Sequence, residues 1–317
     1  MVSHVPRLID ALLGPLVPLS FGRPGLALRR RGFAELARLD GRHAIVTGAN
    51  SGIGRATTAA LAALGARVTM VCRDRGRAET ARDEIARATN GAARLTIERC
   101  DLARLDDVAA LAARLADPID IVIHNAGVLP AQHIVTGDGI ELTWATHVVG
   151  PHLLMRLLRP RCTAATRIVL VSSGGMYLAT LPAPGWVPAP YDGVRAYAAT
   201  KRAQVVLAGL WAMHDPDGPR VVSMHPGWAD TTAVEVSLPR FHAVMRPLLR
   251  DAAGGADTLA WLGAVPIETL IRGAFYFDRA RRATHVLPWR DDSAPRRDEL
   301  WRWLETITQG HVDRATA

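Results

Sequence analysis

The chain has 317 residues, of which 49% are hydrophobic and 21% charged, so it can bury a sizeable core and is not a disordered protein. The formal net charge of +8 comes from arginines scattered along the chain rather than gathered in one patch, which argues against a nucleic-acid-binding protein. The three cysteines are widely spaced and predict neither a disulfide framework nor a zinc site. No apolar run reaches the ~18 residues of a membrane span. The expected location is therefore the cytoplasm.

Residues 1–40 precede the first predicted strand as an N-terminal extension. Six apolar side chains in this segment recur at the spacing of one helical face: Leu8, Ile9, Leu12, Leu13, Leu16 and Val17. Pro15 and Pro18 should end that helix, and Arg23 and three consecutive arginines at 29–31 follow it. An apolar face followed by arginines is typical of a peripheral contact with an anionic membrane. The alternative is that residues 8–19 pack on the domain or on a partner.

Strand-like apolar runs alternate with helical stretches through most of the remaining chain. The predicted strands are residues 43–47, 67–72, 94–99, 119–124, 167–172 and 220–225, and helices are predicted at 55–64, 78–88 and 103–116. This alternation indicates right-handed βαβ units. We therefore predict an α/β protein with a three-layer, doubly wound Rossmann fold and a parallel sheet of about seven strands. The domain should span residues 41–285, with a tail at 286–317.

A glycine-rich turn follows the first predicted strand and leads directly into a helix. It contains Gly48, Gly52 and Gly54 with Asn50 and Ser51 between them. Glycines allow the backbone to turn tightly and approach a pyrophosphate, whose charge is stabilised by the helix N-terminus. A turn of this kind can also be purely structural, but its position between strand and helix favours nucleotide binding.

The glycine spacing resembles that of the short-chain dehydrogenase/reductase family, and further motifs follow in the family's order. They are Asn125-Ala126-Gly127, Ser172-Ser173, Tyr197-Ala198-Ala199-Thr200-Lys201, and Pro226-Gly227 with Thr231. The chain is identified as a member over about residues 41–280. The sequences SSGGM at 172–176, MHPGWADT at 224–231 and GADT at 255–258 are most similar to the branch of dehydrogenase/reductase family member twelve, which resembles retinol dehydrogenases.

The pair Tyr197 and Lys201 can also be argued from chemistry alone. Residues four apart share one helical face, so both side chains can point into one cleft. A tyrosine is a poor proton donor or acceptor at neutral pH, and a nearby cation lowers the pKa of its hydroxyl. Lys201 is the chain's sole lysine among 38 basic residues, which makes a chance surface pair improbable.

The resemblance implies a role for each of these residues. Tyr197 would be the general acid/base, Lys201 would lower the pKa of Tyr197 and bind the nicotinamide ribose, and Ser173 would hydrogen-bond the reacting oxygen. The family's fourth catalytic residue is an asparagine that anchors a water, and His147 takes its position here. A histidine can bind water and exchange protons. The alternative is a packing histidine and a weakened relay.

Cofactor preference is set near the end of the second strand. The position of the acid that would select NAD(H) holds Cys72, and Arg73 follows it, with Arg55 as a second phosphate partner. NADP(H) is therefore expected over NAD(H). Asp74 is interpreted as a helix N-cap, whereas Asp101 either contacts adenine or caps the next helix. The complete predicted cofactor set is Gly48, Asn50, Ser51, Gly52, Ile53, Gly54, Arg55, Arg73, Asp101, Leu102, Asn125, Ala126, Gly127, Tyr197, Lys201, Pro226, Gly227, Trp228 and Thr231.

These features predict an NADP(H)-dependent enzyme that interconverts a carbonyl and an alcohol on a small or lipid-like apolar molecule. The rival hypothesis, prompted by His147, is an NADP(H)-binding sensor or scaffold without catalysis. The proline-rich loop 178–193 should lie beside the substrate, with Trp186 and Tyr191 as an apolar wall, unless it is only a rigid connection. The histidine spacing predicts no metal site. By analogy, the helices of His147 and Tyr197 would pair in a homodimer.

Overall fold

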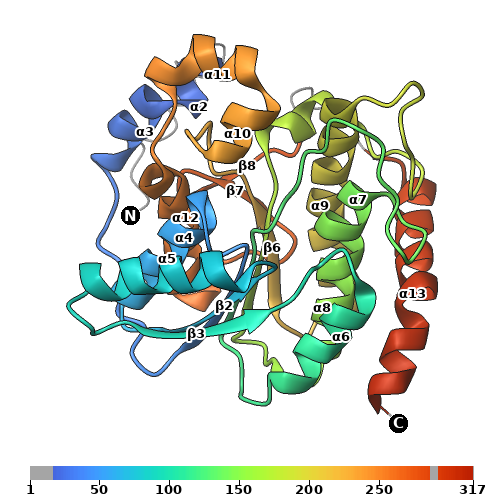
Figure 1. Cartoon of the computed structure of the whole chain (residues 1–317), viewed down its shortest axis with the longest axis horizontal. Helices are drawn as coiled ribbons and strands as arrows, with labels where there is room; N and C mark the ends of the chain where they lie inside the picture. Colours follow the sequence, from blue (N-terminus) through green and yellow to red (C-terminus); the bar gives the residue numbers. More distant parts are fainter. Residues whose placement is uncertain (1–16, 286–291, 317) are drawn as a thin grey trace.

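The computed structural model describes residues 17–285 and 292–316, so the helix expected near residues 8–13 lies outside the described residues. A mixed sheet with the order β3-β2-β1-β4-β5-β6-β7-β8 forms the centre of the described chain (Figure 1). Its strands are β1 (His43–Thr47), β2 (Arg67–Cys72), β3 (Arg94–Arg99), β4 (Ile121–His124), β5 (Arg167–Val171), β6 (Arg220–Met224), β7 (Phe275–Phe277) and β8 (Ala280–Arg282). The first three strands have the predicted bounds.

The sheet is parallel from β3 to β7, and the last strand reverses direction. β8 pairs antiparallel with β7 through a hairpin in which Phe277 faces Ala280. Asp278 and Arg279 form its two-residue turn, both with positive φ, as this kind of hairpin requires. The predicted doubly wound α/β fold is confirmed, with this one antiparallel strand added at the edge.

Two helical layers cover the sheet, and the central strands β1, β4 and β5 are buried on both faces, whereas the edge strand β3 is partly exposed. The first layer contains α4 (Gly52–Ala63), α5 (Arg75–Ala88) and α12 (Ala252–Ala264); the second contains α6 (Leu105–Arg114), α8 (Gly150–Leu158) and α9 (Gly193–His214). Along β1, Ala44 and Val46 belong to the core under the first layer, whereas Ile45 belongs to the core under the second. This burial on both faces explains why the strands are continuous apolar runs.

Residues that precede and follow the doubly wound core pack against it as helices. The helix α13 (Ala294–Thr316) lies outside α6, α8 and α9, where Glu305 binds His152 and Arg156 of α8. The shorter elements are α2 (Val17–Phe21), α3 (Arg23–Arg30), α7 (Leu142–Trp144), the π-helix η1 (Ala145–Val149), η2 (Arg159–Arg161), η3 (Gly174–Leu178), α10 (Thr232–Ser237), α11 (Pro239–Met245), η4 (Arg246–Leu248) and η5 (Ile267–Thr269). In the described residues, no helix combines the length and apolar character needed to cross a bilayer.

Candidate active site

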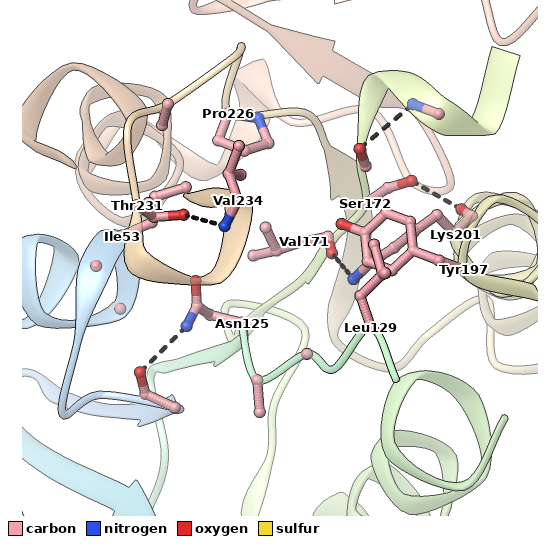
Figure 2. A pocket seen from close by; sticks show the side chains of 18 of the residues that line it. Ile53, Asn125, Leu129, Val171, Ser172, Tyr197, Lys201, Pro226, Thr231 and Val234 are labelled. Carbon is pink, nitrogen blue, oxygen red and sulfur yellow. Dashed lines mark hydrogen bonds between the residues drawn. The ribbon is translucent and has the colours of Figure 1, made fainter. Parts of the chain in front are cut away.

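A cavity of about 960 Å³ opens at the carboxyl ends of the parallel strands, where the strand order changes direction between β1 and β4. This is the place where open α/β sheets bind their ligands. Figure 2 shows how its side chains converge from several loops. Within the described chain, every residue predicted for the site lines this cavity except Arg55 and His147.

The glycine-rich turn is packed so closely that side chains would not fit. Gly48 has a φ of +66°, and a Cβ on it would lie 2.9 Å from the Cα of Ala126, while a Cβ on Gly54 would lie 2.1 Å from the oxygen of Gly48. The Asn125 amide donates 3.0 Å to the Thr47 carbonyl and so fixes this turn to the next loop. The turn therefore presents backbone to the cavity.

The N-terminus of α4 offers hydrogen-bond donors at the same place. Ser51 is its N-cap, and among the described residues its side chain makes no capping bond to the helix. The first N–H groups of a helix have no partner within the helix, and they favour an anion. Gly52, Ile53 and Gly54 of this first turn line the cavity, so the site fits the pyrophosphate of a dinucleotide.

Two arginines lie at the outer end of the cavity, beyond β2. Arg73 lines it as predicted, and Arg77, which the sequence analysis missed, lines it as well. Asp74 caps α5 by accepting a 3.0 Å bond from the Arg77 N–H, which confirms its interpretation as an N-cap. Arg55 is ion-paired with Glu84 on the surface and is not among the residues that line the cavity, so its position does not support the predicted second phosphate contact. The available signal for Arg77 was its place in the first turn of α5, close behind Arg73 in the chain.

Asp101 also lines the cavity, beside Leu102. Its carboxylate accepts a 3.0 Å bond from the Ala103 N–H, and the N-cap of α6 is Arg104. The alternative of an N-cap at Asp101 is therefore wrong.

Tyr197 and Lys201 lie beside one another at the inner end of the cavity (Figure 2), which Ser173 also lines. Asp192 starts α9 by accepting bonds of 2.9 and 3.1 Å from the first N–H groups, which places Tyr197 one turn inside the helix. The Lys201 ammonium lies 5.4 Å from the centre of the Tyr197 ring and donates 2.8 Å to the Val171 carbonyl. The Ser173 hydroxyl accepts a 3.3 Å bond from the Gly175 N–H, which holds it at the start of η3.

Burial determines the protonation of Lys201 and Tyr197. It lowers the pKa of Lys201 to about 7 and raises the pKa of Tyr197. The neighbouring Ser173 hydroxyl opposes this rise in the pKa of Tyr197. The resemblance leads us to expect that Lys201 lowers the pKa of Tyr197. Burial of the phenol is the main influence on this pKa in the structure, and the expected effect of Lys201 stays a prediction.

The lowered pKa of Lys201 predicts a pH dependence of stability. Between pH 7 and about 10, the folded state binds fewer protons than the unfolded state, so the free energy of unfolding rises with pH. Lys201→Met removes this contribution. Its stability relative to the parent should be highest at pH 6 and fall steadily to pH 9.5, as measured by urea unfolding. A difference that does not change with pH would contradict the buried, titrating amine.

His147 is completely buried and both of its ring nitrogens have protein partners. Nε2 accepts a 2.9 Å bond from the Val128 N–H, which assigns the proton to Nδ1, and Nδ1 lies 2.8 Å from the Thr200 hydroxyl. Burial, with the charge of Lys201, holds the pKa of His147 well below its ordinary value. The ring is therefore neutral and fully engaged, which favours the packing alternative over the predicted part in a proton relay.

Gln204 is a buried residue of the site that the sequence analysis missed. Its Nε2 donates 2.9 Å to the His147 carbonyl, and its Oε1 accepts a 3.0 Å bond from the Lys201 ammonium. Gln204 thus connects the backbone of η1 to Lys201. The signal for it was its position one helical turn after Lys201, on the same face of α9.

A model of the short chain dehydrogenase family matches residues 42–240. The chain belongs to this family. It is 37% identical over 269 residues to dehydrogenase/reductase SDR family member 12 from Bos taurus, covering 83% of this chain and 84% of that protein. Retinol dehydrogenase 14 from Homo sapiens is 30% identical, with 96% of this chain and 98% of that protein covered.

A solved short chain dehydrogenase from Burkholderia cenocepacia, in complex with NADP, matches with a TM-score of 0.60 and 26% identity, over 75% of this chain and 96% of that one. The predicted family and branch are confirmed. This short-chain dehydrogenase is thus an NAD(P)-binding oxidoreductase that is similar to retinol dehydrogenases.

The proline-rich loop of this short-chain dehydrogenase does not form the wall that was expected. In loop 178–193, which the structure describes throughout, Leu178 alone lines the cavity. Trp186 accepts a 2.8 Å bond from the Trp144 indole at its carbonyl and packs its ring under Arg195. Tyr191 donates 3.2 Å to Glu141. These contacts turn both aromatic rings away from the cavity, so the loop acts as a rigid connection between β5 and α9.

Proposed function

We propose that this short-chain dehydrogenase interconverts a carbonyl and an alcohol on a small or lipid-like apolar molecule, with NADP(H) as the hydride carrier. The observation that supports this is the convergence of Ser173, Tyr197 and Lys201 at the inner end of the cavity that also holds the glycine-rich turn. The nicotinamide, when bound, supplies or accepts the hydride. The protein's own residues manage the proton and the charge on oxygen.

Tyr197 moves the proton. Because burial raises the pKa of its hydroxyl, Tyr197 keeps its proton at neutral pH and is ready to donate it to a carbonyl oxygen. The Ser173 hydroxyl hydrogen-bonds the same oxygen as negative charge develops on it. The Lys201 ammonium, held at the Val171 carbonyl and Gln204, supplies positive charge that stabilises the phenolate once the proton has left.

A panel of carbonyl compounds tests the proposal directly. NADPH oxidation should be followed with aldehydes, ketones and quinones, and retinal belongs in the panel because of the name of the human relative. NADPH binding should be measured in parallel by fluorescence. Tyr197→Phe serves as the blank that separates enzymatic turnover from background reduction. Binding without turnover on any member would contradict catalysis.

NADPH binding without turnover on any carbonyl compound would support a second candidate function, an NADP(H)-binding sensor or scaffold. The observation in its favour is His147, whose ring nitrogens are both occupied at the position where the family carries an asparagine. The same panel therefore decides between the two functions.

Arg73 and Arg77 support NADP(H) over NAD(H), because guanidinium groups pair well with a phosphate. Arg73→Glu should raise the KM for NADPH by about tenfold or more and reduce the preference over NADH, since it replaces an attractive charge with a repulsive one. Arg55→Glu is the matched control and should change neither constant by more than about threefold, since its side chain points at Glu84. Equal effects of the two substitutions would show that Arg73 does not bind the phosphate.

Gln204 should act as a positioning residue for Lys201. Gln204→Leu removes an acceptor from the ammonium and should lower its pKa, whereas Gln204→Glu adds a negative charge and should raise it. In the pH profile of log kcat/KM, the alkaline limb should therefore move to lower pH for Gln204→Leu and to higher pH for Gln204→Glu. A purely structural role would lower the rate without moving the limb in opposite directions.

Three further predictions from the sequence accompany this proposal. They are the cytoplasmic location, the peripheral membrane contact through residues 1–40, and the homodimer.

A further inference from the structure

The N-terminal segment contributes a side chain to the cavity. Phe21, at the end of α2, lines it together with four aromatic residues from distant parts of the chain, and we call these five residues the aromatic wall: Phe21, Tyr177, Trp228, Phe241 and Phe277. The ring of Phe21 lies 5.1 Å from that of Phe277, 5.8 Å from that of Trp228 and 6.4 Å from that of Tyr177, centre to centre. Trp228 in turn lies 5.1 Å from Phe241.

Phe21 lies close to the reacting end of the cavity. A Cβ on Gly174, the residue after Ser173, would lie 3.0 Å from Cε2 of Phe21. The Phe21 carbonyl accepts a 2.9 Å bond from the N–H of Trp228, which directly follows the predicted cofactor residues Pro226 and Gly227. Phe21 is thus placed between the Ser173 loop and the loop after β6.

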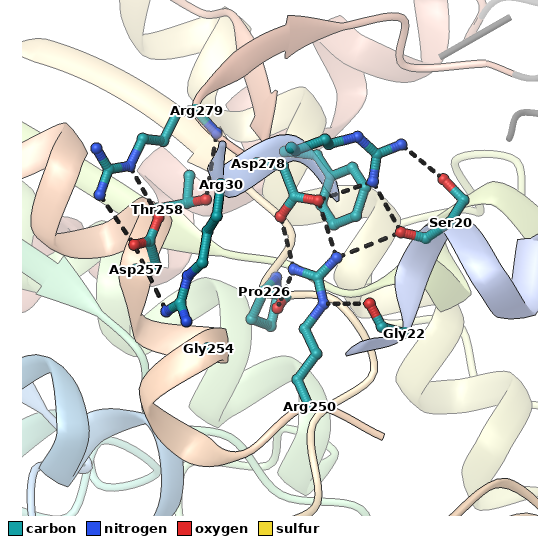
Figure 3. A network of polar contacts seen from close by, with 12 residues as sticks. Ser20, Gly22, Arg30, Pro226, Arg250, Gly254, Asp257, Thr258, Asp278 and Arg279 are labelled. Carbon is teal, nitrogen blue, oxygen red and sulfur yellow. Dashed lines mark hydrogen bonds and ion pairs between the residues drawn. The ribbon is translucent and has the colours of Figure 1, made fainter. Parts of the chain in front are cut away.

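A buried ionic network fixes the backbone on both sides of Phe21 (Figure 3). The Arg250 guanidinium donates 3.3 Å to the Ser20 carbonyl and 3.2 Å to the Gly22 carbonyl. It is held by Asp278 at 2.6 and 2.9 Å, and Arg29 binds the same carboxylate at 2.9 Å. The side chains of Arg250 and Asp278 are each only 1% exposed, so this anchor is part of the core. The position of Phe21 is therefore fixed before any ligand binds.

We propose that Phe21 contacts the substrate and, with the rest of the aromatic wall, makes the enzyme prefer planar, ring-bearing carbonyl compounds over flexible acyclic ones. Aromatic side chains gain stacking and edge-to-face contacts with a flat ligand, and a rigid ligand loses little conformational freedom on binding. The proposal rests on the proposed carbonyl chemistry of the same cavity. It assigns a substrate-selecting role to a residue that precedes the first strand of the sheet.

The test compares Phe21→Ala with Phe33→Ala. Phe33 belongs to the same N-terminal segment but packs under Arg279, 4.4 Å from its guanidinium, and does not line the cavity. With 9,10-phenanthrenequinone, Phe21→Ala should lose about tenfold in kcat/KM, mainly through KM, whereas decanal should lose less than about threefold. Phe33→Ala should leave the ratio of the two substrates unchanged. Equal losses on both substrates, or no loss, would overturn the proposal.

A binding measurement separates this inference from the proposed reaction. The dissociation constant of 2-acetylnaphthalene should be measured by calorimetry with NADP⁺ present, because a ketone and oxidised cofactor cannot react. Phe21→Ala, and Phe21→Leu as a variant that retains bulk and folding, should weaken binding by about tenfold and about threefold. If this holds without turnover on any substrate, the proposed reaction fails and the inference stands. If turnover occurs and neither variant changes binding or selectivity, the inference fails alone.

Discussion

Tyr197→Phe should lower kcat at least about 100-fold, because it removes the hydroxyl that transfers the proton while leaving the ring in place. The dissociation constant for NADPH should stay within about threefold, since the glycine-rich turn and the two outer arginines are untouched. Steady-state rates with the most active carbonyl compound of the panel, together with fluorescence titration of NADPH, provide both numbers.

A matched control lies outside the cavity. Tyr191 does not line it, and its hydroxyl donates 3.2 Å to the Glu141 carboxylate. Tyr191→Phe should therefore keep kcat within about threefold. Retention of more than about a tenth of the rate by Tyr197→Phe would show that another group carries the proton.

The parallel core and much of the cavity could be predicted from the sequence because they depend on local patterns. Strands buried on both faces are continuous apolar runs, and the glycine-rich turn occupies its place between strand and helix for steric reasons visible in the glycines themselves. Asp74 was assigned as an N-cap from its position alone, and its side chain accepts from Arg77 as that assignment requires.

Features that depend on contacts between distant residues could not be predicted. Phe21 meets Trp228 and Phe277 across more than two hundred residues of chain, and no local pattern in the N-terminal segment indicates those partners. The orientation of the Trp186 side chain relative to the cavity depends on Trp144 and Arg195, which belong to other elements. The β7–β8 hairpin turns at Asp278-Arg279, which lacks the Asn-Gly or Asp-Gly signature of such turns.

His147 shows why a position in a motif does not determine a role. The segment around it forms the π-helix η1 rather than a regular α-helix, and its carbonyl binds Gln204. The ring meanwhile connects the loop after β4 to α9 through Val128 and Thr200. Whether a histidine is free to exchange protons depends on these partners, which lie in the loop after β4 and in α9, both distant from His147 in the chain.

The second large effect is expected in stability, at Asp278. Asp278→Asn should lower the free energy of unfolding by about 3 kcal/mol, because it removes the carboxylate shared by two buried guanidinium groups, Arg29 and Arg250. Asparagine is the informative substitution because the residue has a φ of +48°, which asparagine tolerates and most other side chains do not. Urea unfolding at neutral pH measures the change.

Asp40→Asn is the control for this prediction. Asp40 also binds an arginine, Arg38, but the two side chains are 60% and 62% exposed, so solvent screens the pair and its loss should change the free energy of unfolding far less than the loss at Asp278. A similarly small change for Asp278→Asn would mean that the carbonyls of Ser20, Gly22 and Pro226 suffice to hold Arg250. A large change would show that the Asp278 carboxylate stabilises the fold. The same carboxylate holds Arg250, which binds the carbonyls of Ser20 and Gly22 and so keeps Phe21 against the cavity.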